Sequence, residues 1–275
     1  MSMHVAGVGA LEDPICHYPG SALPVRGPCA DLTAPYLAFL GGSETFGRFV
    51  AAPFPALLDR FLGQTCVNLG SISAGPDAML SDAKVMRIAA AAASTVVQIP
   101  GAQNLSNQYY RVHPRRNDRF LRPSRRLTAL YPDIDFTEFH FTKHLVTSLY
   151  RCSPGRFAPV LEELRAVWIA RMERLLQALE GRALLLWLQY EDTRPRGDEP
   201  LGPDPLLVTG AMIGRVAPRA RGLIEVPVVP AGQLAGETEK MAFGPLQAPA
   251  ANHMLGPRMH KRIAARLAEA VKAQR

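Results

Sequence analysis

The sequence lacks the features that mark out a membrane protein, a zinc protein or a redox enzyme. It has only 4 cysteines among 275 residues, and no two of them form a CxxC pair. All four are therefore expected to be buried or idle thiols: Cys16, Cys29, Cys66 and Cys152. No apolar run approaches the ~20 residues that a membrane-spanning helix needs, and the first residues lack the basic start and apolar stretch of a secretion signal. We therefore expect a cytoplasmic protein without a membrane span.

The composition is that of a globular protein with an uneven surplus of positive charge. Hydrophobic residues make up 48% of the chain and charged residues 20%, which excludes a wholly disordered or a fibrous protein. A chain of 275 residues is long enough to bury a full core without help from disulfides or metals. The net charge of +7 is concentrated in residues 111–126, so its distribution is more informative than its total.

Five short apolar and β-branched runs alternate with helical patterns. The runs predict parallel strands at 36–40, 65–69, 95–99, 183–189 and 223–229. The patterns between and after them predict helices at 55–62, 77–92, 157–179, 205–216 and 257–272. This alternation is typical of a three-layer α/β/α, flavodoxin-like domain with a five-strand parallel sheet. Ligands of such sheets bind outside the carboxyl ends of the strands.

Two stretches interrupt this alternation. Residues 1–35 are rich in Gly and Pro, and we expect an extended arm that packs on the domain or is partly disordered. Residues 102–156 are too long for an ordinary loop, and we expect a partly helical insertion that could act as a lid. The domain itself is expected to span residues 36–275.

Polar residues and glycines follow the predicted strands. Ser43 lies in a strand-to-helix turn, FLGGSETFG, where neighbouring glycines leave its hydroxyl little covered. The alternative is that Ser43 only caps the following helix. The later loops supply possible hydrogen-bond donors and a base: Gly70, Gly75, Gln103, Asn104 and His253. His260, within the first turn of the last helix, is expected to pack in the core, and His253 could equally be an ordinary surface histidine.

In this order and spacing the segments resemble the four blocks of the SGNH or GDSL hydrolase superfamily. The resemblance covers most of the chain and implies a serine hydrolase fold and chemistry. By position it implies Ser43 as the nucleophile and His253 as the base, with an oxyanion hole formed by Gly70 or Gly75 and by Gln103 or Asn104. The chain departs from the pattern at Gly42, where the family has aspartate, and at Ala250, where it has the acid that orients the histidine. A Ser-His dyad, a backbone carbonyl or another acid would then set the tautomer of His253.

The insertion contains a run of arginines, YYRVHPRRNDRFLRPSRR. Seven arginines face one acid, Asp118, and guanidinium groups bind carboxylate, sulfate or phosphate in a bidentate manner. We therefore expect an anionic substrate to contact the insertion and the residue after the serine: His113, Arg115, Arg116, Arg119 and Glu44. A solvated basic loop and an interface with an acidic partner are equal alternatives. Nucleic acid is a weaker candidate, because aromatic residues are too few to make a stacking surface.

No metal or cofactor is expected. His140 and His144 share a helical face, but the sequence identifies no third ligand. The sequence thus predicts an ester hydrolase or O-acyltransferase that acts on an anionic carbohydrate or other glycan. The alternative is a non-catalytic protein of the same fold that binds an anionic ligand or partner, and homo-oligomer formation stays open. The segments GGSET and HPRRNDR are also similar to those of an uncharacterised bacterial family of unknown function.

Overall fold

The centre of the molecule is a sheet of five parallel strands. The structure is a computed structural model that describes residues 14–191 and 201–273. The strands are β3 (Leu37–Leu40), β4 (Cys66–Asn68), β5 (Ser94–Gln98), β8 (Ala183–Tyr190) and β9 (Gly222–Val228), in the spatial order β4-β3-β5-β8-β9. All neighbouring pairs are parallel, which confirms the predicted α/β class. The order is that of flavodoxin-like sheets.

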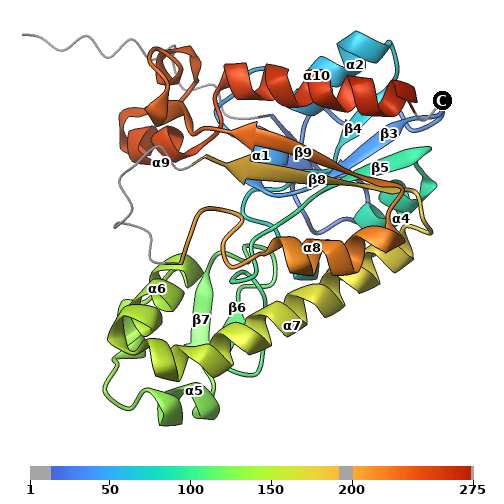
Figure 1. Cartoon of the computed structure of the whole chain (residues 1–275). Helices are drawn as coiled ribbons and strands as arrows, with labels where there is room; N and C mark the ends of the chain where they lie inside the picture. The colour runs from blue at the N-terminus through green and yellow to red at the C-terminus, as the bar shows by residue number, and fades with distance from the viewer. Residues whose placement is uncertain (1–13, 192–200, 274–275) are drawn as a thin grey trace, which may run out of the picture.

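Helices cover both faces of this sheet (Figure 1). One face packs against α2 (Phe54–Leu62) and α10 (Pro257–Ala273), and the other against α3 (Pro76–Ser81), α4 (Ala83–Ala91), α7 (Pro154–Ala178) and α8 (Gly210–Val216). In α10 the buried residues Met259, Ile263 and Leu267 recur every four positions, so the helix presents one apolar stripe to the sheet. The three-layer architecture is thus confirmed. In the described part of the chain, no helix combines the length and apolar character needed to cross a bilayer.

The helix predicted at 77–92 is in fact two helices, α3 and α4. Asp82 separates them because its side chain accepts hydrogen bonds from the N–H groups of Lys84 and Val85 and so caps α4. The other carboxylate oxygen accepts from the Ser21 hydroxyl and from the N–H groups of Ala22 and Leu23. One buried carboxylate therefore ends one helix, starts the next and ties the N-terminal segment to the domain.

The insertion forms a subdomain that packs on α7, at the bottom of Figure 1. It comprises an antiparallel hairpin, β6 (Tyr110–Val112) and β7 (Phe120–Pro123), followed by α5 (Arg125–Leu130), η1 (Phe136–Glu138) and α6 (Thr142–Cys152). The predicted helical content is confirmed, but the hairpin was not predicted. In the hairpin Tyr110, Val112 and Phe120 are buried. The arginines between and beside them hide this alternation in the sequence.

The link from β9 to α10 is irregular. It contains η3 (Ala231–Gln233), η4 (Thr238–Lys240), η5 (Pro245–Gln247) and α9 (Ala248–His253), and η2 (Ala217–Arg219) precedes β9. In Figure 1, α9 lies beyond the carboxyl ends of β8 and β9. This link therefore lies at the edge of the sheet where a ligand is expected.

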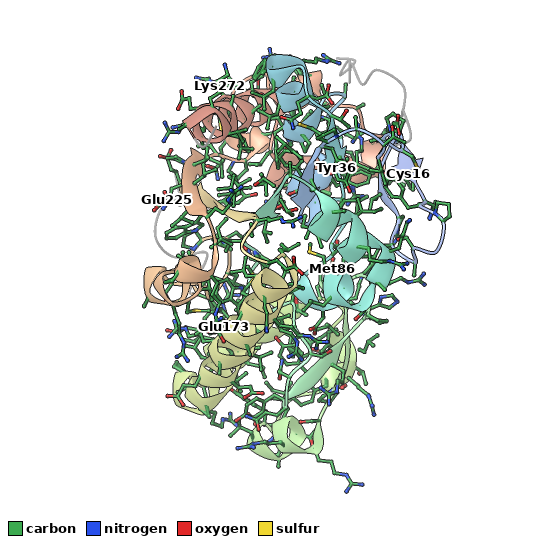
Figure 2. The ribbon with its side chains drawn as sticks, turned by 90° about the vertical axis from the view of Figure 1, so that its right-hand side faces the viewer. Cys16, Tyr36, Met86, Glu173, Glu225 and Lys272 are labelled. Atoms are coloured by element: carbon green, nitrogen blue, oxygen red, sulfur yellow. A yellow bond between two sulfur atoms is a disulfide. The ribbon has the colours of Figure 1, made fainter. Side chains whose placement is uncertain are left out.

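The described part of the N-terminal segment packs on the domain. Strands β1 (Ile15–Cys16) and β2 (Val25–Arg26) pair in antiparallel fashion, and a disulfide joins Cys16 to Cys29. Figure 2 shows Cys16 on the opposite side of the molecule from Glu225 of β9. The expectation of four free thiols was wrong for this pair, because residues 13 positions apart meet only after the chain doubles back. Cys66 and Cys152 are free, and residues 1–13 of the predicted arm lie outside the described residues.

The disulfide should be detectable by alkylation of the unfolded protein. Without reductant we expect two reactive thiols, Cys66 and Cys152, and four after reduction. The double variant Cys16→Ser/Cys29→Ser should lose about 3 kcal/mol of stability in urea unfolding, because a cross-link over a loop of this length restricts the unfolded chain. Cys152→Ser serves as the control. Four alkylated thiols before reduction would contradict the pairing.

His260 is a buried core residue of α10, as the sequence predicted. Its side chain is 1% exposed and stacks on Phe54, and its Nδ1 accepts a hydrogen bond from the Phe54 N–H at 3.1 Å. Burial, together with the nearby charge of Arg26, lowers the pKa of His260 to about 3. The imidazole is therefore neutral in the folded protein and cannot serve the proposed site as a base.

Folding stability should depend on pH through His260. The unfolded chain binds a proton here below its ordinary pKa of about 6.5, whereas the folded chain binds one only near pH 3. As pH falls through this window, the unfolding constant should rise by up to about tenfold per pH unit. His260→Asn keeps an acceptor oxygen but does not titrate, so it should remove this part of the slope. Equal slopes for both proteins in urea titrations between pH 5 and 7.5 would refute the assignment.

Candidate functional site

Ser43 is the first residue of the short helix α1 (Ser43–Phe46), directly after β3. The N-cap of α1 is Gly42, and no side chain caps the helix, so the capping alternative for Ser43 was wrong. Instead, Ser43 Oγ accepts a hydrogen bond from the Ser73 N–H at 3.1 Å. Ser73 has a positive φ of 58°, a region that L-residues rarely occupy and that is enriched at functional sites. Ser43 has no hydrogen-bonded base within the described residues, so its hydroxyl proton stays available.

A cavity of about 370 Å³ opens above Ser43. Its walls come from the loops after β3, β4, β5 and β8 and from the insertion. The polar lining residues are Ser43, Glu44, Ser73, Gln98, Gln103, Asn104, Asp118, Thr142, Lys143, Tyr190 and Asp204. The structure thus brings Ser43 together with Gln103, Asn104 and Glu44, all singled out from the sequence.

Asn104 presents a hydrogen-bond donor to this cavity. Its Oδ1 accepts a hydrogen bond from the Thr142 hydroxyl, which leaves the two N–H groups of Nδ2 for a ligand. Gln103 is 6% exposed, and its Oε1 is buried without a partner. Because buried polar atoms are nearly always paired, this oxygen marks a place for a ligand or water donor. Through its hydrogen bond, Thr142 of the insertion orients the side chain of Asn104 in the loop after β5.

Gly70 and Gly75 do not contribute free N–H groups. The Gly70 N–H donates to Asn68 Oδ1 at 2.9 Å, and the Gly75 N–H donates to Asn117 Oδ1 at 2.8 Å. Gly70 is instead a packing residue, since an added Cβ would lie 2.4 Å from the backbone nitrogen of Phe46. The prediction that these glycines supply oxyanion donors was wrong, because side-chain amides that the sequence did not single out already use their N–H groups.

Glu44 belongs to a hydrogen-bonded wall of the same cavity. Its carboxylate accepts from Gln98 Nε2 at 2.8 Å and from the Tyr190 hydroxyl at 3.4 Å. Burial raises the pKa of Tyr190 well above its ordinary value, and the charge of Glu44 adds to this rise. The phenol therefore stays protonated and donates. Lys143 and Asp204 also line the cavity. They form an ion pair with an N–O distance of 3.3 Å.

Asp118 is a functional candidate that sequence reasoning did not identify. Its Oδ1 is buried without a hydrogen-bond partner, and burial raises the pKa of the carboxyl despite the opposing effects of Ser73 and Arg119. It lines the cavity that contains Ser43. The available signal was its position as the only acid within the arginine run. A carboxyl with one unpaired oxygen and a raised pKa, lining a serine cavity, is suited to proton transfer.

His253 is exposed at the last residue of α9 and lines an adjoining cavity of about 400 Å³. The two cavities have a common border, which is formed by Glu44, Lys143, Tyr190, Asp204 and Met254. Among the described residues, no hydrogen bond joins His253 to Ser43. The structure therefore places the predicted base next to the serine cavity but not against the nucleophile.

The predicted anion-binding residues line yet another cavity. His113, Arg115, Arg116 and Arg119 border a space of about 560 Å³ together with residues of the N-terminal segment. None of these four lines the Ser43 cavity. No group of three His, Cys, Asp or Glu side chains suited to a metal ion occurs within residues 14–191 and 201–273.

A buried arginine from the N-terminal segment holds the chain that follows Ser43. Arg26 of β2 is 6% exposed, and its guanidinium donates to the carbonyl oxygens of Phe46 and Gly47 at 3.4 and 2.9 Å. It also donates to those of Val50 and Ala51 at 2.9 and 3.4 Å. The positive charge lies at the C-terminal end of α1, where carbonyl groups lack helical partners. Arg26 therefore fixes the turn that follows α1, the short helix that begins with Ser43.

Replacement of Arg26 by methionine should destabilise the protein. The variant keeps the apolar stem but leaves four carbonyl oxygens without this donor, and we expect a loss of about 3 kcal/mol in urea unfolding. Arg122→Met removes the same charge from an exposed strand position and should change stability little. Equal stabilities of the two variants would show that Arg26 does not hold this turn.

Comparisons with known proteins identify the family of the chain but no curated relative. No curated protein matches the chain. One family model matches, and it covers residues 1–275. The chain therefore belongs to the family described as Domain of unknown function (DUF6473).

Proposed function

We propose that the protein is a serine-dependent ester hydrolase or O-acyltransferase with Ser43 as the nucleophile. One observation carries this proposal: Ser43 and Asn104 line the same cavity at the carboxyl edge of the sheet, and the Asn104 Nδ2 group has no hydrogen-bond partner among the described residues. The resemblance to SGNH hydrolases in block order supports it. A glycan that bears an acyl group is the substrate class that this resemblance favours.

The proposed reaction begins with attack of Ser43 Oγ on the acyl carbonyl carbon. The negative charge that develops on the carbonyl oxygen would receive a hydrogen bond from Asn104 Nδ2. When the tetrahedral intermediate collapses, its bond to the ester oxygen breaks, the base returns the serine proton to that oxygen, the alcohol leaves and an acyl-serine remains. Water then releases the acid in a hydrolase, whereas a sugar hydroxyl takes the acyl group in a transferase.

Asp118 is the favoured acceptor for the Ser43 proton. It lines the cavity of the serine, and its raised pKa lies closer to neutral pH than that of an ordinary carboxyl, which suits a general base. A single water would carry the proton between them. His253 lines the adjoining cavity and is the alternative base.

The second candidate function is binding without catalysis. Two observations favour it. No base is hydrogen-bonded to Ser43 within the described residues, and Ala250 stands where the SGNH pattern has the acid that orients the histidine. In this case the same cavity would hold an uncleaved ligand through Asn104 and Gln103. The two functions differ in whether substitution of Ser43 abolishes turnover or only alters binding.

Ser43→Ala should reduce the hydrolysis of chromogenic acetyl esters by at least ~10³-fold, because the nucleophile is lost. Asn104→Ala should reduce kcat by ~10²–10³-fold, as expected for one oxyanion donor. The control is Ser81→Ala, an exposed serine on α3 outside the cavity, and it should leave turnover unchanged. Turnover that survives in Ser43→Ala would remove Ser43 as nucleophile, and a wild-type protein that binds acetylated glycans without turnover would favour the second function.

A further inference from the structure

The arginine cavity has a built interior and is separate from the serine cavity. Its volume is about 560 Å³, within the range of sites for small organic ligands. The insertion contributes His113, Arg115, Arg116 and Arg119 to its lining, and the apolar lining residues are Ile15, Pro24, Phe46 and Ile72. The lining thus combines cationic and apolar groups.

The guanidinium groups of this cavity have no ion-pair partner in the part of the chain that the structure describes. None of Arg115, Arg116 and Arg119 forms an ion pair within the described residues, although seven other ion pairs are formed there. The Arg119 guanidinium stacks over the Phe141 ring at 4.3 Å, which restricts its motion but leaves its N–H edge free to bind. Three guanidinium groups at one cavity are suited to a doubly charged tetrahedral anion rather than to a carboxylate.

The turn that carries these arginines is fixed by hydrogen bonds. His113 Nδ1 accepts from the N–H groups of Arg115 and Arg116 at 3.2 and 3.1 Å. The fully buried Asn117 donates to the His113 carbonyl at 2.9 Å and accepts from the Gly75 N–H at 2.8 Å. With Nδ1 as an acceptor, the imidazole carries its proton on Nε2 and can donate to a ligand. A turn that is ordered in this way loses little entropy when it binds an anion.

The apolar lining residues are suited to a hydrocarbon group. Phe46 is 1% exposed, and the Arg26 guanidinium lies 5.3 Å from its ring centroid. Ile15, by contrast, is 55% exposed, so a ligand in the cavity would cover apolar surface that now contacts water. A cavity lined by both cationic and apolar groups would bind the two ends of an amphiphile.

We propose that the arginine cavity binds a phosphate monoester that carries an alkyl or acyl chain. The phosphate lies against Arg115, Arg116 and Arg119, and the chain lies against Ile15, Phe46 and Ile72. This site does not depend on the proposed esterase activity, because its residues do not line the Ser43 cavity.

Isothermal titration calorimetry with octyl phosphate, inorganic phosphate and octanol tests the proposal on the full chain. Octyl phosphate should bind at least tenfold more tightly than inorganic phosphate, because only the octyl chain covers the apolar lining residues of the cavity. Octanol should bind at least tenfold more weakly than octyl phosphate, because it lacks the charge. Arg115→Gln/Arg116→Gln should weaken octyl phosphate binding by at least tenfold. Ser43→Ala should bind it as the wild type does.

The matched control is Arg122→Gln/Arg125→Gln. It removes the same charge from exposed residues of the same insertion that do not line the cavity. Equal weakening in both double variants, or equal affinity for octyl phosphate and inorganic phosphate, would overturn the proposal. A measurement on the wild type needs no variant to fold: octyl phosphate should protect Arg115 and Arg116, but not Arg122, from phenylglyoxal. Failure of this protection would also overturn it.

Discussion

The geometry of the candidate site depends on one buried cation, the guanidinium of Arg26. It satisfies backbone carbonyl oxygens at the end of α1 and in the turn that follows, at a place where the chain leaves the sheet edge and needs donors. Arg26 is itself positioned by β2, which pairs with β1 beside the Cys16–Cys29 disulfide. A segment outside the α/β core therefore sets the conformation after the serine. A buried charge of this kind is costly unless it is fully hydrogen-bonded, so the turn and the N-terminal segment stabilise each other.

The two cavities beside Ser43 and the arginines share one wall. Ser71 and Ile72 line the arginine cavity, whereas Ser73 and Ala74 line the serine cavity. Ser73 donates its N–H to Ser43, and its carbonyl oxygen accepts from Asn117 at the end of the arginine turn. The positive φ of Ser73 is retained because its N–H group is bonded to Ser43 and its carbonyl oxygen to Asn117. A short strained segment therefore connects the nucleophile to the insertion.

The sheet, the layers and the position of Ser43 could be predicted from the sequence, because strands buried on both faces are continuous apolar runs and ligand loops follow them. What escaped prediction depends on contacts between distant residues. Asp82 divides a continuous helical pattern through bonds to residues 21–23, and Asn117 and Asn68 use the glycine N–H groups that the motif offered. That the arginines bind an anion stays a prediction. Their separation from Ser43 follows from a hairpin that charged residues conceal.

The carboxyl of Asp118 lies at the electrostatic junction of these parts. Burial raises its pKa, while the charges of Arg119 and Arg116 lower it. Those same arginines line the neighbouring cavity, so an anion bound there would offset their charge and weaken its effect on Asp118. The pKa of Asp118 would then rise further, and proton uptake by Asp118 would in turn strengthen anion binding by the same factor. Such an anion would couple the two cavities through charge alone, without any movement of the wall between them.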